Sequence, residues 1–240
     1  MARLSSSPRP WFYVVARVVG RDGALPLWKE RLVHLCGVSA TEPYGDSYYW
    51  GGDLDGEPDT LWGLEGYTHP IGFFIDHVSS EIFKREMALV DSDALLRTKQ
   101  GLGSPDYDLH HYDEEAGFLK RQDDPDRHST DSHVAVYHFW AADEAGRTRV
   151  LEALSRFATD AETSQGASGS IQSALVLKEC RDLKLATLWL RVKTGDAFKA
   201  LEASGLLADL LGEVKGLCEK TELHQSSSFG GHLDIKASPN

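Results

Sequence analysis

Two histidines and several carboxylates stand close together at residues 108–115, D-L-H-H-Y-D-E-E. Two imidazoles and one carboxylate can form a facial metal site, so metal binding is one interpretation of this stretch. Adjacent residues of a strand point to opposite faces, however, and His110 and His111 could not reach one ion without a bulge. A related stretch, E-L-H-Q-S-S-S at 222–228, has serines in place of the acids. We therefore expect no metal here and place His110 at the end of a strand.

A better candidate for catalysis is His77, within F-F-I-D-H-V-S-S-E-I-F-K at 73–84. As a general base near neutral pH it could remove a proton from a phenol or an activated C–H group. Part of this segment recurs 124 residues later, where Leu201 takes the place of His77. A single histidine is more often structural, but the difference between the two copies favours a catalytic role for His77.

Aromatic and hydrogen-bonding side chains surround this segment in the first half of the chain, and they would suit a flat phenolic ligand. The matching strand of the second half, S-A-L-V-L at 173–177, is aliphatic. Trp62 recurs as Trp189, which favours core packing for it and leaves a place in a cleft wall as the alternative. The candidate substrate-binding residues are Tyr49, Trp62, Tyr67, His69, Phe74 and His110.

Hydrophobic periodicity predicts the same order of elements twice, strand-helix-strand-strand-helix-strand. In the first half the strands are expected at 11–20, 46–52, 60–67 and 107–112, and the helices at 24–37 and 71–88. In the second half the strands are expected at 133–140, 171–180, 186–192 and 220–224, and the helices at 146–158 and 196–211. This is the ferredoxin-like βαββαβ arrangement, so the fold class is α+β.

The domains are expected at 1–122 and 133–240, joined by a polar linker at 123–132. The first strand of each half is apolar on both faces, so we expect the two repeats to pack sheet to sheet as an intramolecular pseudo-dimer. The first repeat has about ten extra residues within 88–106. We expect this segment to be a lid on the first cleft, with Leu95, Leu96 and Leu102 reaching a ligand.

The composition narrows the classes of function. Acidic residues outnumber basic ones, 37 against 25, and a net charge of −12 disfavours nucleic acid and anionic membranes as partners. No apolar run approaches the roughly 18 residues of a membrane span, and we expect a cytoplasmic protein. Three scattered cysteines predict buried free thiols. Nucleotide, flavin and serine-hydrolase motifs are absent from the sequence, so we expect no cofactor.

Three segments carry a family resemblance: V-V-A-R-V at 14–18, T-L-W at 60–62 and the segment at 73–84. With them the chain resembles a tandem fusion of two antibiotic-biosynthesis-monooxygenase domains, of the dimeric α/β-barrel superfamily. The resemblance implies a cleft between each sheet and its helices, and cofactor-independent oxygenation of electron-rich aromatics. It disfavours the haem-degrading branch, because Met87 and His77 stand where that branch has its iron-binding histidine and a tryptophan.

The leading expectation is a small-molecule tailoring enzyme that oxygenates a phenolic or polyketide-like aromatic, with His77 as base and the second repeat as scaffold. Three alternatives stay open: a non-oxidative cyclase, dehydratase or isomerase of a polyketide pathway, a non-catalytic ligand-binding module, and a metal-dependent enzyme resembling the vicinal-oxygen-chelate group. The expected partner is a small aromatic substrate. Further homodimerisation stays open.

Overall fold

The computed structural model describes residues 11–121, 124, 131–164 and 170–236, which divide into two compact units. We call residues 11–110 and 226–236 the N-terminal unit, and the described residues between 111 and 225 the C-terminal unit. The expected linker at 123–132 falls largely outside the described residues, and the expected repeat boundaries stay a prediction.

The fold is α+β, and its eight strands form a closed antiparallel barrel. This confirms the fold class that was expected from the sequence. Around the barrel the strands are β1 (Phe12–Val19), β3 (Thr60–Tyr67), β2 (Gly45–Asp53), β8 (Cys218–His232), β5 (His133–Ala141), β7 (Leu185–Val192), β6 (Ile171–Glu179) and β4 (Tyr107–Phe118). β4 and β8 are longer than expected because each contributes residues to both units.

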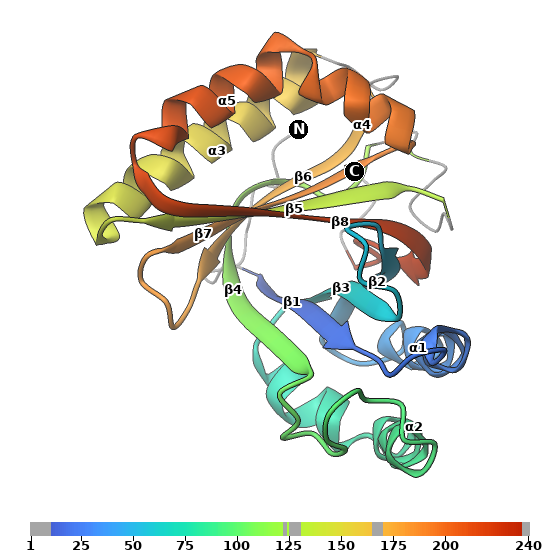
Figure 1. Ribbon diagram of the computed structural model, residues 1–240. Coiled ribbons are helices and arrows are strands. Elements are labelled where there is room, and N and C mark those ends of the chain that lie inside the picture. The colour runs from blue at the N-terminus through green and yellow to red at the C-terminus, as the bar shows by residue number, and fades with distance from the viewer. Residues whose placement is uncertain (1–10, 122–123, 125–130, 165–169, 237–240) are drawn as a thin grey trace. The chain divides into compact units, whose positions relative to one another are not determined.

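In the N-terminal unit, helices α1 (Leu25–Ser39) and α2 (Glu81–Ser92) lie on one side of β1, β2 and β3 (Figure 1). The helical spacing expected for α1 is confirmed, since Trp28, Leu32 and Leu35 are its buried apolar residues. Pro26 lies in the first turn, where its missing N–H has no helical partner to lose. The helix was expected to end at Gly37, but it continues to Ser39.

The single helix expected at 71–88 is two helices. A π-helical segment, η1 (Gly72–His77), is followed by Ser80 in an extended conformation (φ −62°, ψ 142°), and α2 then begins at Glu81. The Ser80 hydroxyl accepts a hydrogen bond from the backbone N–H of Phe83 at 3.1 Å. A serine in this position competes with the helix for backbone groups and so favours a helix start.

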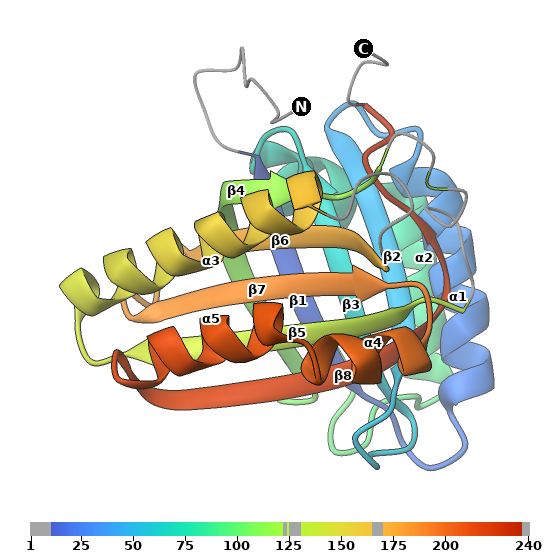
Figure 2. The same cartoon turned by 90° about the horizontal axis from the view of Figure 1, so that it is seen from above.

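The C-terminal unit repeats this design. Helices α3 (Glu144–Ser164), α4 (Gly195–Glu202) and α5 (Gly205–Lys215) cover one face of β5, β6 and β7 (Figure 2). The helix expected at 196–211 is broken at Ser204, whose backbone is extended (φ −79°, ψ 152°). Since Ser204 follows Ser80 by the repeat offset of 124, the structure supports the alignment of His77 with Leu201.

The segment expected to be a lid packs instead against the body of the N-terminal unit. Leu95 and Leu96 are buried in the same apolar core as Trp28, and the Leu95 carbonyl accepts a hydrogen bond from the N–H of Arg21. The expectation that these two leucines contact a ligand is therefore wrong. Only Leu102 of the three is exposed.

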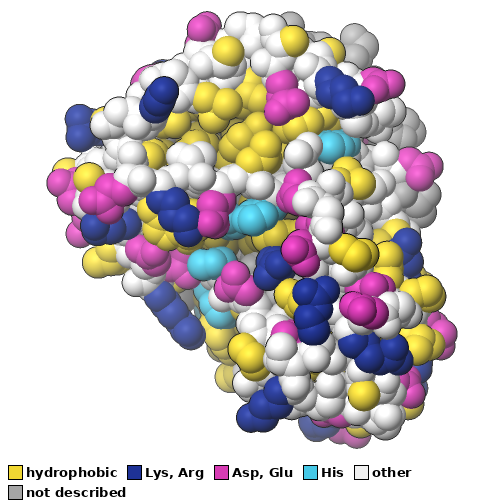
Figure 3. All heavy atoms as spheres, in the orientation of Figure 1, with side chains coloured by type: hydrophobic (Ala, Val, Ile, Leu, Met, Phe, Trp, Pro, Cys, Tyr) yellow, Lys and Arg dark blue, Asp and Glu magenta, His cyan; other side chains and the backbone are white. Residues whose placement is uncertain are grey.

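None of the helices among the described residues combines the length and apolar character needed to cross a membrane. On the face drawn in Figure 3, lysine and arginine side chains are interspersed with aspartate and glutamate, and the described residues form no continuous basic stripe there.

Candidate functional site

His77 ends the π-helical segment and is buried, with 1% of its surface exposed. Its Nδ1 donates to the carboxylate of Glu42, at 2.9 Å from Oε1 and 3.1 Å from Oε2. Glu42, in the loop between α1 and β2, is itself 7% exposed. The other ring nitrogen, Nε2, has no hydrogen-bond partner among the described residues. His77 therefore has one nitrogen held by a carboxylate and one nitrogen that is buried without a hydrogen-bond partner among the described residues.

A second carboxylate lies on β3. Glu65 is buried, and its Oε2 accepts a hydrogen bond of 2.7 Å from the hydroxyl of Tyr67. The imidazole of His77 lies against the rings of Tyr67, Tyr48 and Phe83, with centroids 6.2, 5.9 and 5.0 Å away. The histidine is thus enclosed by aromatic rings and flanked by two acids.

The strand register explains how these side chains meet. Residues two apart on a strand share a face, so Glu65 and Tyr67 both point toward the helices. Tyr48 on β2 stands directly opposite Glu65. Gly72 opens the π-helical segment in close contact with β3, because a Cβ there would lie 2.7 Å from the Tyr67 ring. This close approach brings His77 to Tyr67.

Burial and charge act in opposite directions on this group. Burial lowers the pKa of His77, but the hydrogen bond to Glu42 and the charges of Glu65 and Glu42 outweigh it and raise that pKa above 6.5. Burial raises the pKa of Glu65, and the charge of His77 opposes that rise. Burial also raises the pKa of Tyr48 well above 10, as does the charge of Glu65.

A thiol and a second histidine belong to the same unit. The Sγ of Cys36, on α1, lies 3.3 Å from the Nδ1 of His232, at the end of β8. His232 is 5% exposed, and burial raises the pKa of the Cys36 thiol. The three thiols are free, as expected, but they are not buried as expected: Cys36 and Cys218 are partly buried and Cys180 is exposed.

Of the residues expected to bind substrate, the structure brings Tyr67 to His77, whereas Phe74 is exposed and His69 is partly exposed. Phe74 is 46% exposed and packs on Phe12 and Phe73. His69 accepts a hydrogen bond from the N–H of Ile71 and lies against the Tyr44 ring.

Other expected residues are placed elsewhere. Trp62 alternates with Glu65 and Tyr67 along β3, so it points to the opposite face, where its Nε1 donates to Asp53 at 2.9 Å. Tyr49 likewise alternates with Tyr48, and its hydroxyl donates to Ser228. His110 lies in β4 with its Nε2 3.5 Å from an oxygen of Asp108. Their assignment to a substrate site stays a prediction.

Sequence reasoning missed Glu42, Glu65 and His232. Glu65 carried a usable signal, since it is a charged residue in a strand, T-L-W-G-L-E-G-Y, that is otherwise apolar enough to be covered on both faces. Glu42 and His232 had none, because each lies far from His77 in the sequence.

No three His, Cys, Asp or Glu side chains in the described part of the chain are arranged to hold a metal ion. His110 and His111, the pair considered from the sequence, are on β4, and His111 is buried while His110 is partly exposed.

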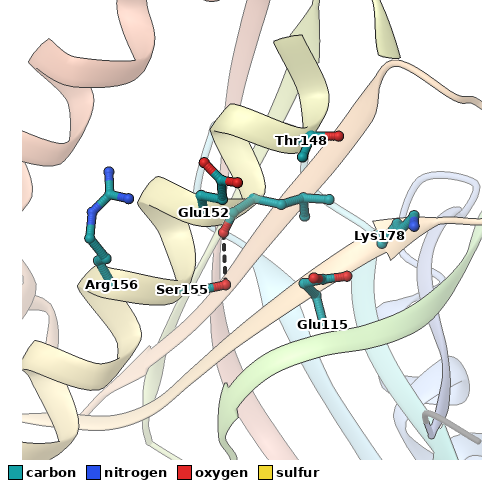
Figure 4. A pocket seen from close by; sticks show the side chains of 7 residues that line it. Glu115, Thr148, Glu152, Ser155, Arg156 and Lys178 are labelled. Carbon is teal, nitrogen blue, oxygen red and sulfur yellow. Dashed lines mark hydrogen bonds between the residues drawn. The ribbon is translucent and has the colours of Figure 1, made fainter. Parts of the chain in front are cut away.

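A separate hollow of about 390 Å³ lies in the C-terminal unit, between α3, β4 and β6 (Figure 4). Its lining is mostly charged or polar: Glu115, Thr148, Leu151, Glu152, Ser155, Arg156 and Lys178. Ser155 donates to the Leu151 carbonyl within the helix. The hollow contains neither an aromatic ring nor a histidine, so it does not resemble the site at His77.

No family model matches the sequence, and no curated protein matches it either. Solved structures do. A protein from Fusobacterium nucleatum subsp. nucleatum, provisionally named a monooxygenase, superposes with a TM-score of 0.75 over 97% of this chain and 100% of its own, at 11% identity. The chain shares its fold with this protein. A second provisionally named monooxygenase, from Lactobacillus acidophilus NCFM, gives 0.73 over 95% and 100% of the two chains, at 9% identity.

A third structure, described as an anthrone oxidase-like protein, gives a TM-score of 0.61 over 96% of this chain and 97% of its own, at 12% identity. Identities this low establish the fold alone. That fold is the barrel implied by the family resemblance noted above.

Proposed function

We propose that this protein is an enzyme that removes a proton from an electron-rich aromatic substrate and directs the resulting anion to dioxygen. The observation that carries the proposal is the buried His77–Glu42 pair, whose Nε2 has no partner among the described residues. The names of the proteins with the same fold, two monooxygenases and one anthrone oxidase-like protein, agree with this reaction class.

The geometry defines what His77 would do. With Nδ1–H donated to Glu42, the neutral imidazole has its lone pair on Nε2, and the carboxylate stabilises the imidazolium that forms on proton uptake. The rings of Tyr48, Tyr67 and Phe83 pack on the imidazole and keep water from it. In this proposal the protein removes the proton, and the substrate anion itself passes electrons to dioxygen.

The reaction balances without another reductant. A phenolate or enolate of an anthrone-type ring is electron-rich enough to pass an electron to dioxygen. The ring methylene then loses two hydrogen atoms and gains one oxygen atom as a carbonyl, while the second oxygen atom leaves as water. Carbon loses four electrons and dioxygen gains four.

Oxygen consumption with an anthrone as probe, followed by ¹⁸O₂ labelling, tests the proposal. We expect one labelled oxygen in the product and a loss of roughly 10²–10⁴-fold in kcat for His77→Gln, the usual contribution of a positioned base. His34→Gln is the matched control, because His34 lies in the same unit with a half-exposed side chain. A folded His77→Gln variant with full activity would show that the site is misplaced.

The same base could serve a cyclisation, dehydration or isomerisation, since these also begin with loss of an activated proton. Turnover that continues under argon, with no label in the product, would favour that alternative. Substrates of polyketide type and a role in secondary metabolism belong to this proposal as well.

A further inference from the structure

The C-terminal strap, residues 233–236, runs along the beginning of β2 in the N-terminal unit. Backbone N–H groups of the strap donate to the Ser47 hydroxyl (from Asp234, 2.9 Å), to the Asp46 carbonyl (from Ile235, 3.2 Å) and to the Asp46 carboxylate (from Lys236, 3.0 Å). Leu233 is fully buried. The strap is therefore fixed to the strand that follows Glu42.

The side chain of Lys236 reaches further along the chain. Its ammonium group donates to the carbonyl oxygen of Glu42 and to that of Pro43, the latter at 2.6 Å. Two carbonyls that share one ammonium are drawn together, and a charged donor makes stronger hydrogen bonds than a neutral one. Lys236 therefore fixes the backbone from which the Glu42 side chain extends.

The other contacts of this loop hold its two ends. The N–H of Glu42 donates to the Ser39 carbonyl at 3.3 Å, and the Tyr44 carbonyl accepts from Thr68 at 2.9 Å. Lys236 supplies the contacts between those ends, at Glu42 and Pro43. Without the Lys236 ammonium, the loop that carries the Glu42 carboxylate would lose its hydrogen bonds at the Glu42 and Pro43 carbonyls. It would keep the hydrogen bonds described at its two ends.

We infer that Lys236 is a positioning residue, which holds the loop of Glu42 so that the carboxylate stays on Nδ1 of His77. The inference rests on the proposed function for its effect on turnover. The expected effect of Lys236 on the pKa of His77 does not depend on that function.

The groups that face His77 define what the experiment should detect. They are Glu42 from the loop, Glu65 and Tyr67 from β3, Tyr48 from β2 and Phe83 from α2. Of these, Glu42 supplies the hydrogen bond and, with Glu65, the negative charge that keep the imidazolium stable against burial. A displaced Glu42 would leave burial less opposed, so the pKa of His77 would fall.

The experiment is an NMR titration of the full chain with ¹⁵N-labelled histidine, in which the His77 signals are assigned by their loss in His77→Gln. In Lys236→Met the pKa of His77 should move down, while in Lys236→Arg it should stay near that of the unchanged protein. Lys220→Met is the matched control, because Lys220 lies on β8 with an exposed side chain in the C-terminal unit. Turnover of the anthrone probe should fall by roughly 10-fold to 10²-fold in Lys236→Met alone, and its pH profile should move with the His77 titration.

The outcomes separate the two proposals. A folded Lys236→Met protein with an unchanged His77 titration would overturn the positioning role. If this variant does not fold, Lys236→Ala also removes the donor, and an unchanged titration there has the same meaning. A titration that shifts in a protein without oxygenase activity would support the role of Lys236 and reject the proposed function.

Discussion

Both units place helices on one face of their strands, but they fill the space between these layers differently. In the N-terminal unit, the space between the helices and the strands contains His77, Glu65 and Tyr48. In the C-terminal unit the corresponding core contains Leu201, Val176 and their aliphatic neighbours, and His133 is stacked on Phe198 at 4.5 Å. The N-terminal unit thus has ionisable side chains between its helices and strands, where the C-terminal unit has mainly apolar side chains.

Burying such groups lowers stability unless each finds a partner. Glu42 and Glu65 have partners, but Nε2 of His77 has none among the described residues. A cost of this kind persists when it serves function, and proteins commonly depart from stable packing at their functional sites. The comparison therefore agrees with the proposal that the active site lies in the N-terminal unit.

The helices before Ser80 and Ser204 differ in the same sense. The first is π-helical and the second α-helical, although a serine in extended conformation follows each within three residues. Phe74, in the π-helical segment, is exposed, whereas its counterpart Phe198, in the α-helix, is buried. Single π-helical turns occur often at functional sites.

The largest effect on stability should come from Leu201→Ala. Leu201 is 4% exposed within the core of the C-terminal unit, so its truncation should lower the free energy of unfolding by about 2–5 kcal/mol. His77→Ala should lose less stability, yet nearly all turnover. Urea unfolding and anthrone turnover of both variants are the measurements. If Leu201→Ala lowered kcat as much as His77→Ala without loss of stability, the assignment of roles to the two units would be reversed.

An effect of intermediate size should appear in the dependence of stability on pH. The pKa values of Glu65 and His77 are both raised in the folded protein, so each group binds its proton more tightly when folded. The stability from Glu65 is full below pH 4.5 and that from His77 below pH 6.5, and each is lost as pH rises through the folded pKa. For either group, proton binding that is tenfold tighter in the folded chain than in the unfolded chain contributes about 1.4 kcal/mol.

Melting temperatures between pH 4 and 9 should therefore decline toward the alkaline side, and Glu65→Gln should flatten the acidic part of this decline. Leu201→Ala provides the comparison, because it should lower the whole curve without changing its slope. A stability that rises from pH 5 to 8 would contradict the assignment.

The smallest effect distinguishes the two serines. Ser80 accepts a capping hydrogen bond from Phe83, whereas the Ser204 side chain caps no backbone N–H and instead donates to the Leu201 carbonyl. Ser80→Ala should lower stability by about 1 kcal/mol, and Ser204→Ala by less. Paired thermal unfolding of the two variants checks this difference. Equal losses would mean that the caps do not differ in strength.

Local patterns were enough to predict most of the fold. Alternation and turn residues located the strands, and the repeated order of elements led to the barrel. They could not predict the π-helical turn, since an apolar stripe such as Phe74–Val78 is compatible with either helix type. They also could not predict that β4 and β8 belong to both units, because such pairing depends on residues far apart in the chain.

The candidate site was only partly predictable. His77 was found because the repeat offered Leu201 for comparison, and Tyr67 because aromatic residues gather near it. Glu42 lies in A-T-E-P, a polar loop that shows no local sign of burial. Its contacts with His77 and Lys236 form only when the chain folds.

The division of β8 has a consequence for how the protein is made. Residues 226–236 complete the N-terminal unit, yet they are translated long after its other residues. Domains commonly fold in order as they leave the ribosome, but here the first sheet to emerge lacks its last strand until the second repeat has been synthesised. A polypeptide released before residue 226 would carry His77 and Glu42 without the strap that contacts the loop of Glu42. The N-terminal unit can therefore be completed only after translation has reached its last segment, residues 226–236.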